Sequence, residues 1–187
     1  IFSFSMVSWV SAIAATGLIW SGTLILGRLT DPQSVGIFTV GTRLVSLAVF
    51  VMAPITNAFT PHMAHLAHLG RREEAARAYG TATRWILAAS LPAFVLLMTF
   101  AGPLLALFGK EFVVGALVTV VLALGQIVAA AAGPCGVVLN MSGRVALSMV
   151  DNIGVLILNV VLTVALVPPL RIVGAALAWS ISLVVVN

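Results

Sequence analysis

The chain has 187 residues, of which 61% are hydrophobic and only 7% are charged, and its formal net charge is +4. Soluble domains carry about 25% charged residues, so this chain cannot cover a water-facing surface, and a soluble globular enzyme is excluded. Disorder is excluded too, because it requires a polar and highly charged composition. The class that remains is a membrane protein that crosses the bilayer several times, since one helical span needs about 20 apolar residues.

Charged and turn-forming residues divide the chain into six predicted spans, and the runs between them show no alternation of polar and apolar residues. The fold class predicted is therefore all-α, a polytopic transmembrane helix bundle. Gly133-Pro134 predicts a kink in the fourth span, and Pro168-Pro169 predicts the end of the fifth. The predicted spans cover residues 1–27, 35–61, 85–108, 112–139 and 147–167, and the sixth begins at residue 171.

Residues 62–83 form the longest polar segment, and we expect them to be a cytoplasmic amphipathic linker helix between the second and third spans. Glu73 and Arg77 have the i,i+4 spacing of a helical ion pair. Counted over alternate loops, the Lys and Arg residues divide five against three in favour of the side that holds this segment, and the positive-inside rule places that side in the cytoplasm. The five are Arg71, Arg72, Arg77, Arg84 and Arg144. Their partners are expected to be membrane lipids and not nucleic acid, because no aromatic residues alternate with them.

Arg43 is the one charge inside the predicted second span, roughly 12 Å deep at 1.5 Å per residue. Such a charge is costly in a bilayer and usually faces a bundle interior or a water-filled cavity. On a straight helix it shares one sector with other polar residues, namely Thr39, Ser46 and Asn57. We interpret this stripe as the wall of a substrate cavity in which Arg43 binds an anionic group. The alternative is an arginine that reaches the membrane interface along its own alkyl chain.

The fifth predicted span carries a second polar stripe, formed by Ser148, Asn152, Asn159 and Thr163. Such residues either form hydrogen bonds between helices or line a hydrophilic passage, and the sequence leaves both open. Asp151 lies near the start of the same helix. A carboxylate there is favoured by the helix dipole and is spaced to pair with Arg144; the alternative role is coupling transport to a proton or sodium ion.

Three histidines, His62, His65 and His68, are spaced so that successive rings diverge by about 60° around a helix. Neither a cysteine nor a carboxylate joins them before Glu73, so we predict no metal site and no cofactor. Phosphate-binding loops and the nucleophile or zinc motifs of hydrolases are also absent from the sequence. We therefore do not expect an enzyme.

Four stretches resemble the polysaccharide-biosynthesis and O-antigen flippases of the multidrug/oligosaccharidyl-lipid/polysaccharide exporter superfamily. They are LGRLTDPQSVGIFTVGTRLVSLAVFVMAPITNAFTPHMAHL, LGRREEAARAYGTATR, LLALFGKEF and LNVVLTVALVPPLRIVGAALAWSIS. They match the family in the glycine after the first turn (Gly36), an arginine after glycine (Arg43) and a proline break followed by Gly-Ala-Ala (Gly174). The chain departs from the family at Trp20-Ser21-Gly22-Thr23, where many members have an aspartate.

The resemblance implies that residues 1–187 are one lobe, the C-terminal one, of a two-lobe protein. The absence of a starting Met and the apolar run at the end agree with a fragment. It implies a flippase in the bacterial cytoplasmic membrane that moves an undecaprenyl-pyrophosphate-linked glycan by alternating access, with glycan polymerase or assembly proteins as further partners. Arg43 would then hold phosphate or an acidic sugar, and Asn57, Asn152 and Asn159 would bind sugar hydroxyls. The alternatives are a multidrug cation exporter of the same superfamily, for which only Asp151 offers a buried acid, and a non-transporting scaffold for glycan assembly.

Overall fold

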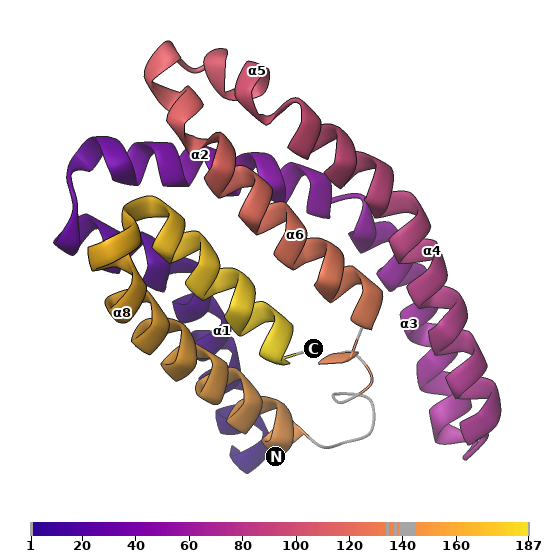
Figure 1. The fold of residues 1–187 in the computed structure, drawn as a ribbon. Coiled ribbons are helices and arrows are strands. Elements are labelled where there is room, and N and C mark those ends of the chain that lie inside the picture. The colour runs from indigo at the N-terminus through magenta and orange to yellow at the C-terminus, as the bar shows by residue number, and fades with distance from the viewer. Residues whose placement is uncertain (1, 134, 137, 139–144, 187) are drawn as a thin grey trace.

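The computed structural model describes residues 2–133, 135–136, 138 and 145–186, and every regular element within them is a helix (Figure 1). The all-α prediction is confirmed for this part of the chain. The elements are α1 (Phe2–Leu29), α2 (Pro32–Val49), α3 (Met52–His68), α4 (Arg72–Thr99), α5 (Ala101–Ala106), the 3₁₀ helix η1 (Lys110–Gly115), α6 (Ala116–Ala132) and α8 (Val145–Val186).

Three helices are long and apolar enough to cross a membrane, namely Arg72–Thr99, Lys110–Ala132 and Leu147–Val185. The number rises to five if each of two bent pairs, one within α1 and one formed by α2 and α3, is a single span. The count of six predicted from the sequence differs because α8 counts once here, although it contains two helices joined at a reversal.

The reversal of α8 lies at Arg171, whose φ of 50° and ψ of −129° are not helical. Pro168 and Pro169 precede it and stay in the last helical turn, so the first half ends slightly later than predicted. The second half folds back so tightly that a Cβ at Gly174 would lie 2.2 Å from the backbone oxygen of Leu166. Only glycine fits this contact, and α8 is a helical hairpin (Figure 1).

α2 and α3 form one bent segment with an angle of 47° between its halves. The break at Phe50 and Val51 lies directly before α3, and the Val51 amide donates to Ala48 O, three residues back, at 3.3 Å. Pro54 explains the position, because a proline lacks the amide hydrogen and its ring clashes with the carbonyl four residues earlier, here that of Phe50. The predicted span 35–61 is therefore not a straight helix.

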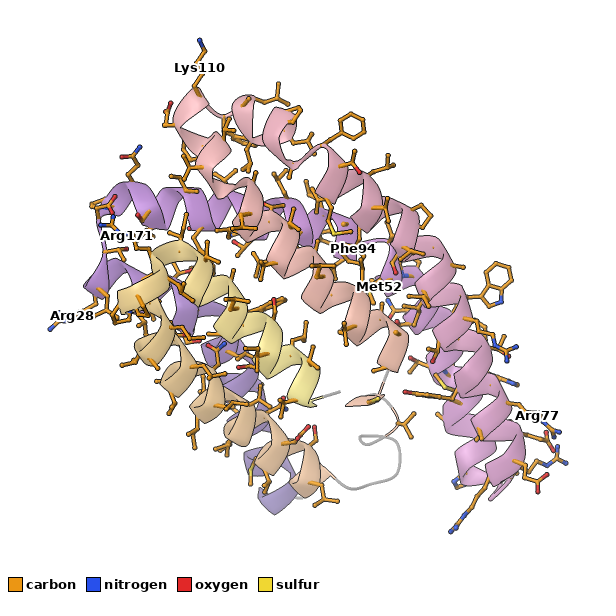
Figure 2. The ribbon with its side chains drawn as sticks, in the orientation of Figure 1. Arg28, Met52, Arg77, Phe94, Lys110 and Arg171 are labelled. Atoms are coloured by element: carbon orange, nitrogen blue, oxygen red, sulfur yellow. The ribbon has the colours of Figure 1, made fainter. Side chains whose placement is uncertain are left out.

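α6 lies at the centre of the bundle (Figure 1) and contacts α8, α4 and α2, while α1 packs along α8 and α3 along α4. The fully buried Phe94 and Leu122 belong to the core between these helices. Arg28, Lys110 and Arg171 lie toward one end of the bundle and Arg77 toward the other (Figure 2). This separation of the basic turns agrees with the alternation of loops predicted from the sequence.

Two local predictions differ from the structure. Residues 62–83 are not a separate linker helix, because they are divided between the end of α3 and the start of α4 by a turn at Leu69–Arg71. The predicted Glu73–Arg77 pair is also not found, since Arg71 Nη1 instead contacts Glu74 Oε2 at 3.4 Å.

The helix of the fourth predicted span is interrupted after Ala132, and residues 135–136 are again helical. α6 stops at Ala132, and Gly133 has a φ of +85°, a left-handed conformation that favours glycine. The expected kink therefore takes the form of a helix end. The described residues do not include Pro134 or Arg144. The ion pair expected between Arg144 and Asp151 therefore lies outside the part of the chain that the structure describes.

Candidate functional site

Arg43 and Ser46 are exposed on one face of α2. The opposite face of the helix is buried in the bundle through Phe38, Gly41 and Val45. Arg43 therefore lies on the surface of the described helices and not between them, and its place on the wall of a substrate cavity stays a prediction. The physical reason for this surface position is the register of α2, in which its small and apolar residues take the contacts with α6 and α4.

The hydroxyl groups near Arg43 already have backbone partners. Thr39 Oγ1, which is half-buried, donates to Val35 O at 2.8 Å, and Ser46 Oγ donates to Thr42 O at 2.8 Å. Arg43 itself forms no ion pair with any carboxylate among the described residues. Its guanidinium is thus the group on this face whose donors are available to a ligand, while the two hydroxyls can still accept.

Asn57 lies on α3, beyond the break, and is also exposed. On a straight helix Asn57 would share a sector with Arg43, but the 47° bend separates α2 from α3. We call the exposed polar residues Arg43, Ser46 and Asn57 the open face. The open face therefore spans both halves of the bent segment.

The polar stripe of α8 is placed differently, against α1. Asn159 is 1% exposed and Thr163 is 0% exposed. Ser21 Oγ of α1 lies 2.8 Å from Asn159 Oδ1, and Thr163 Oγ1 donates to Asn159 O at 2.7 Å. We call Ser21, Asn159 and Thr163 the buried seam. Among the described residues its contacts are those of a hydrogen-bonded helix interface.

The amide of Asn159 can be oriented from its contacts. The Ser21 hydroxyl has one hydrogen but two acceptors in reach, Leu18 O at 3.0 Å and Asn159 Oδ1 at 2.8 Å. Asn159 Nδ2 is buried without a partner among the described residues. Rotating the amide by half a turn lets Nδ2 donate to Ser21 Oγ while Ser21 donates to Leu18 O. This orientation satisfies the buried donor, which is costly to leave unpaired, and we assign it.

The remaining predicted site residues lie near the start of α8. Asn152 is half-buried, Ser148 is 8% exposed, and Asp151 is exposed. Asp151 is thus off the buried stripe, as its register predicted. The described residues contain no group of three or more His, Cys, Asp or Glu that could hold a metal ion, and His62, His65 and His68 are each exposed on α3.

Comparison with known proteins identifies the family. Residues 2–165 match the MatE family. The chain belongs to the MatE family. It is 27% identical over 191 aligned positions to "Probable flippase AglR" of Haloferax volcanii, and this alignment covers 98% of this chain and 39% of that protein. It is 24% identical over 189 positions to "Probable low-salt glycan biosynthesis flippase Agl15" of the same organism, which covers 99% of this chain and 39% of that protein. No solved structure matches.

The MatE assignment confirms the resemblance found in the sequence, and with the apolar helices it establishes a multi-pass membrane protein similar to glycan-biosynthesis flippases. Both relatives are named as probable flippases, a kind of membrane transporter. Both are archaeal, so a bacterial membrane stays a prediction. The MatE chain spans 39% of the length of each relative.

Two contacts that stabilise this MatE bundle were not predicted. Tyr79 of α4 donates its hydroxyl to Ala132 O at the end of α6 and lies 3.0 Å from Cys135 Sγ. Ser180 of α8 donates to Val121 O at 3.0 Å, and a Cβ at Gly125 would lie only 2.7 Å from its side chain. A glycine facing a serine is the small-residue signal for close helix packing, but the sequence does not say which glycine meets which helix.

Proposed function

We propose that this chain forms one lobe of a flippase that moves lipid-linked glycan precursors across a membrane. The observation that carries the proposal is the MatE match over residues 2–165 together with two relatives whose names state a flippase. Because the chain covers 39% of those relatives, the second lobe would come from the rest of the protein.

The open face is the part of this lobe that would line the substrate cavity. An arginine exposed to lipid near the bilayer centre costs about 2.5–3.5 kcal/mol on insertion scales, and the described residues offer Arg43 no carboxylate that would offset this cost. A second lobe that encloses water against α2 and α3 removes the cost. Arg43 would then bind a phosphate or an acidic sugar through its planar fork, and Asn57 would bind sugar hydroxyls.

The topology and mechanism of the lobe form the finer part of the proposal. The lobe would cross the membrane six times if α8 is a hairpin of two spans and each bent pair is a single span, with the α3–α4 turn in the cytoplasm. The lobe would rock against its partner in alternating access, without covalent chemistry or a cofactor. The carrier would be a polyprenyl pyrophosphate, the undecaprenyl form in a bacterial cytoplasmic membrane.

The test is transport by the full-length protein in proteoliposomes, measured as the flipping of a fluorescent pyrophosphate-linked oligosaccharide. We expect Arg43→Ala to lower the initial rate roughly tenfold or more, since a hydrogen bond to a charged group is worth about 1.5–3 kcal/mol. Arg43→Lys should restore only part of the rate, because lysine keeps the charge but lacks the fork.

The matched control is Arg28→Ala, which removes an exposed arginine from the turn at one end of the bundle. It should leave the rate within about twofold of wild type, the scale of a surface charge change. Equal rates for Arg43→Ala and wild type, at equal protein incorporation, would remove Arg43 from the substrate path and with it the proposed role of the open face.

A further inference from the structure

An apolar groove lies between α3 and α4, on the part of the bent segment that follows the break. Its volume is about 370 Å³, and its lining consists of apolar side chains throughout. Four of these come from α3 and one from α4: Pro54, Ile55, Ala58, Phe59 and Trp85. Ala58 is the smallest of these side chains and lies between Ile55 and Phe59 in the sequence.

The groove lies at the edge of the apolar part of α4. No charged residue occurs between Trp85 and Phe108, whereas Arg84 directly precedes Trp85 and Arg77 lies two turns before it. Trp85 is 61% exposed. Tryptophan with a neighbouring arginine is typical of the boundary between acyl chains and headgroups. The composition of α4 therefore favours a boundary near Trp85, with the apolar residues after it toward the hydrocarbon and the two arginines before it toward the headgroups.

Arg77 and Arg84 are both exposed and are not neutralised by neighbours. Arg71 is paired with Glu74 at 3.4 Å, but neither Arg77 nor Arg84 forms an ion pair with a carboxylate of the described residues, Glu73 included. Figure 2 shows Arg77 on the outer side of α4, away from the bundle. These cations therefore face the surroundings of the bundle, where the nearest anions are lipid phosphates.

We propose that the α3–α4 groove binds one anionic phospholipid, with an acyl chain against Ala58, Phe59 and Trp85 and its phosphate held by Arg84. Along α4, the apolar residues that begin at Trp85 and the arginines before it follow the order of an acyl chain and its headgroup. Arg77 lies about 12 Å beyond Trp85 and adds to the attraction for a negative headgroup. The site is independent of the transport proposal, since the groove side of α3 carries Ile55 and Phe59 and the open face carries Asn57 on another side of the helix.

The experiment compares lipid binding by the purified full-length protein, measured by native mass spectrometry with phosphatidylglycerol and phosphatidylcholine of identical acyl chains. Wild type should retain phosphatidylglycerol in preference to phosphatidylcholine. Arg84→Gln should weaken phosphatidylglycerol binding about fivefold, the scale of one cation near a lipid surface, and should leave phosphatidylcholine unchanged. Arg84→Lys should keep the preference. Ala58→Leu should fill the groove and weaken the binding of both lipids.

Two matched controls define the site. Arg28→Gln removes an exposed arginine at the other end of the bundle, and Ala53→Leu adds the same bulk on α3 away from the groove; both should bind like wild type. An equal loss in Arg28→Gln and Arg84→Gln would show diffuse attraction and overturn the proposal, as would unchanged binding by a folded Ala58→Leu variant. A groove that binds a polyprenyl phosphate but shows no preference for phosphatidylglycerol would belong to the glycan carrier, which also overturns it.

Discussion

The buried seam between α1 and α8 and the open face of α2 and α3 are both polar stripes in apolar helices, yet their surroundings are opposite. In the seam, Ser21 and Asn159 form a hydrogen bond with each other, and Asn159 is 1% exposed. On the open face, Arg43 and Asn57 are exposed and Arg43 has no carboxylate partner among the described residues. Polar residues in membrane helices therefore divide into groups whose bonds are used inside the bundle and groups that stay available to a ligand.

The contrast has a practical meaning for reading such sequences. Both stripes have helical spacing and similar residue types, so their spacing does not separate them. Interhelical hydrogen bonds of this kind contribute only about 0.6 kcal/mol on average, whereas an unpaired arginine in a bilayer costs several times as much. A group that is expensive and unpaired is thus the better candidate for function, and mutations should separate the two stripes.

The largest loss of stability is expected at the close contact between the two halves of α8. Gly174→Ala places a methyl group 2.2 Å from Leu166 O, and we expect a loss of about 1–3 kcal/mol or more from overpacking. Gly154→Ala is the matched control, because nothing lies within 4 Å of its added Cβ. Thermal unfolding in detergent measures both, and equal melting temperatures would contradict the tight hairpin.

The second test removes one asparagine side chain from each of the two stripes. Asn159→Ala should lower the free energy of unfolding by about 1 kcal/mol, the usual value of a lost buried hydrogen bond, and should leave the transport rate per folded molecule unchanged. Asn57→Ala should do the reverse, lowering transport without changing stability. Proteoliposome flipping and thermal unfolding of the full-length variants provide the two readouts. A transport loss in a stably folded Asn159→Ala would move that residue from the seam to the substrate path.

A smaller effect isolates the bond within the seam. A double-mutant cycle with Ser21→Ala and Asn159→Ala should give a coupling energy of about 0.6 kcal/mol, the average for membrane hydrogen bonds. Unfolding in detergent supplies the four stabilities. Additive effects would show that the two side chains do not interact, and the seam would then be a coincidence of packing.

The smallest expected effect concerns the start of α2, the helix that carries Arg43. Asp31 accepts from the Ser34 hydroxyl at 2.8 Å and from the Ser34 amide at 3.1 Å, and these bonds hold the pKa of its carboxyl below the ordinary 3.8. A lowered pKa means that the cap is present above the unfolded-state value and is lost as the pH falls through the lower folded value. Hydrogen exchange at the first turn of α2 should therefore rise at pH below 3.8, and Asp31→Asn should abolish this dependence.

The helical class and most of the turns were predictable because charge and proline are explicit in the sequence. Asp31 caps α2 and Lys110 begins η1, both in gaps between the predicted spans, and residues 168–171 reverse the chain. The break at Phe50 also had a signal in Pro54, but the clash falls four residues before the proline, where the sequence is uniformly apolar. The kink predicted at Gly133-Pro134 coincides with the end of α6, but its form was not predictable because a glycine inside an apolar run does not reveal its φ.

The candidate site was less predictable than the fold. A sequence shows which sector of a helix is polar, but it does not show whether that sector faces the interior of the bundle or its surroundings. Arg43 lies on the outer face of α2, because the apolar residues of α2 that meet α6 decide which face of the helix is buried. Asn159 and Asn57 could not be told apart before their neighbours were known, since Ser21 lies 138 residues from Asn159 in the chain.

The reversal at Arg171 has a consequence for how the protein enters the membrane. Only a few residues around Pro168, Pro169 and Arg171 join the two halves of α8, and Gly174 already packs against Leu166. The linker is too short for one half to complete its insertion while the other waits in water. The halves are therefore expected to partition into lipid as a preassembled pair, with Arg171 as the single charge that the insertion machinery must carry across or retain.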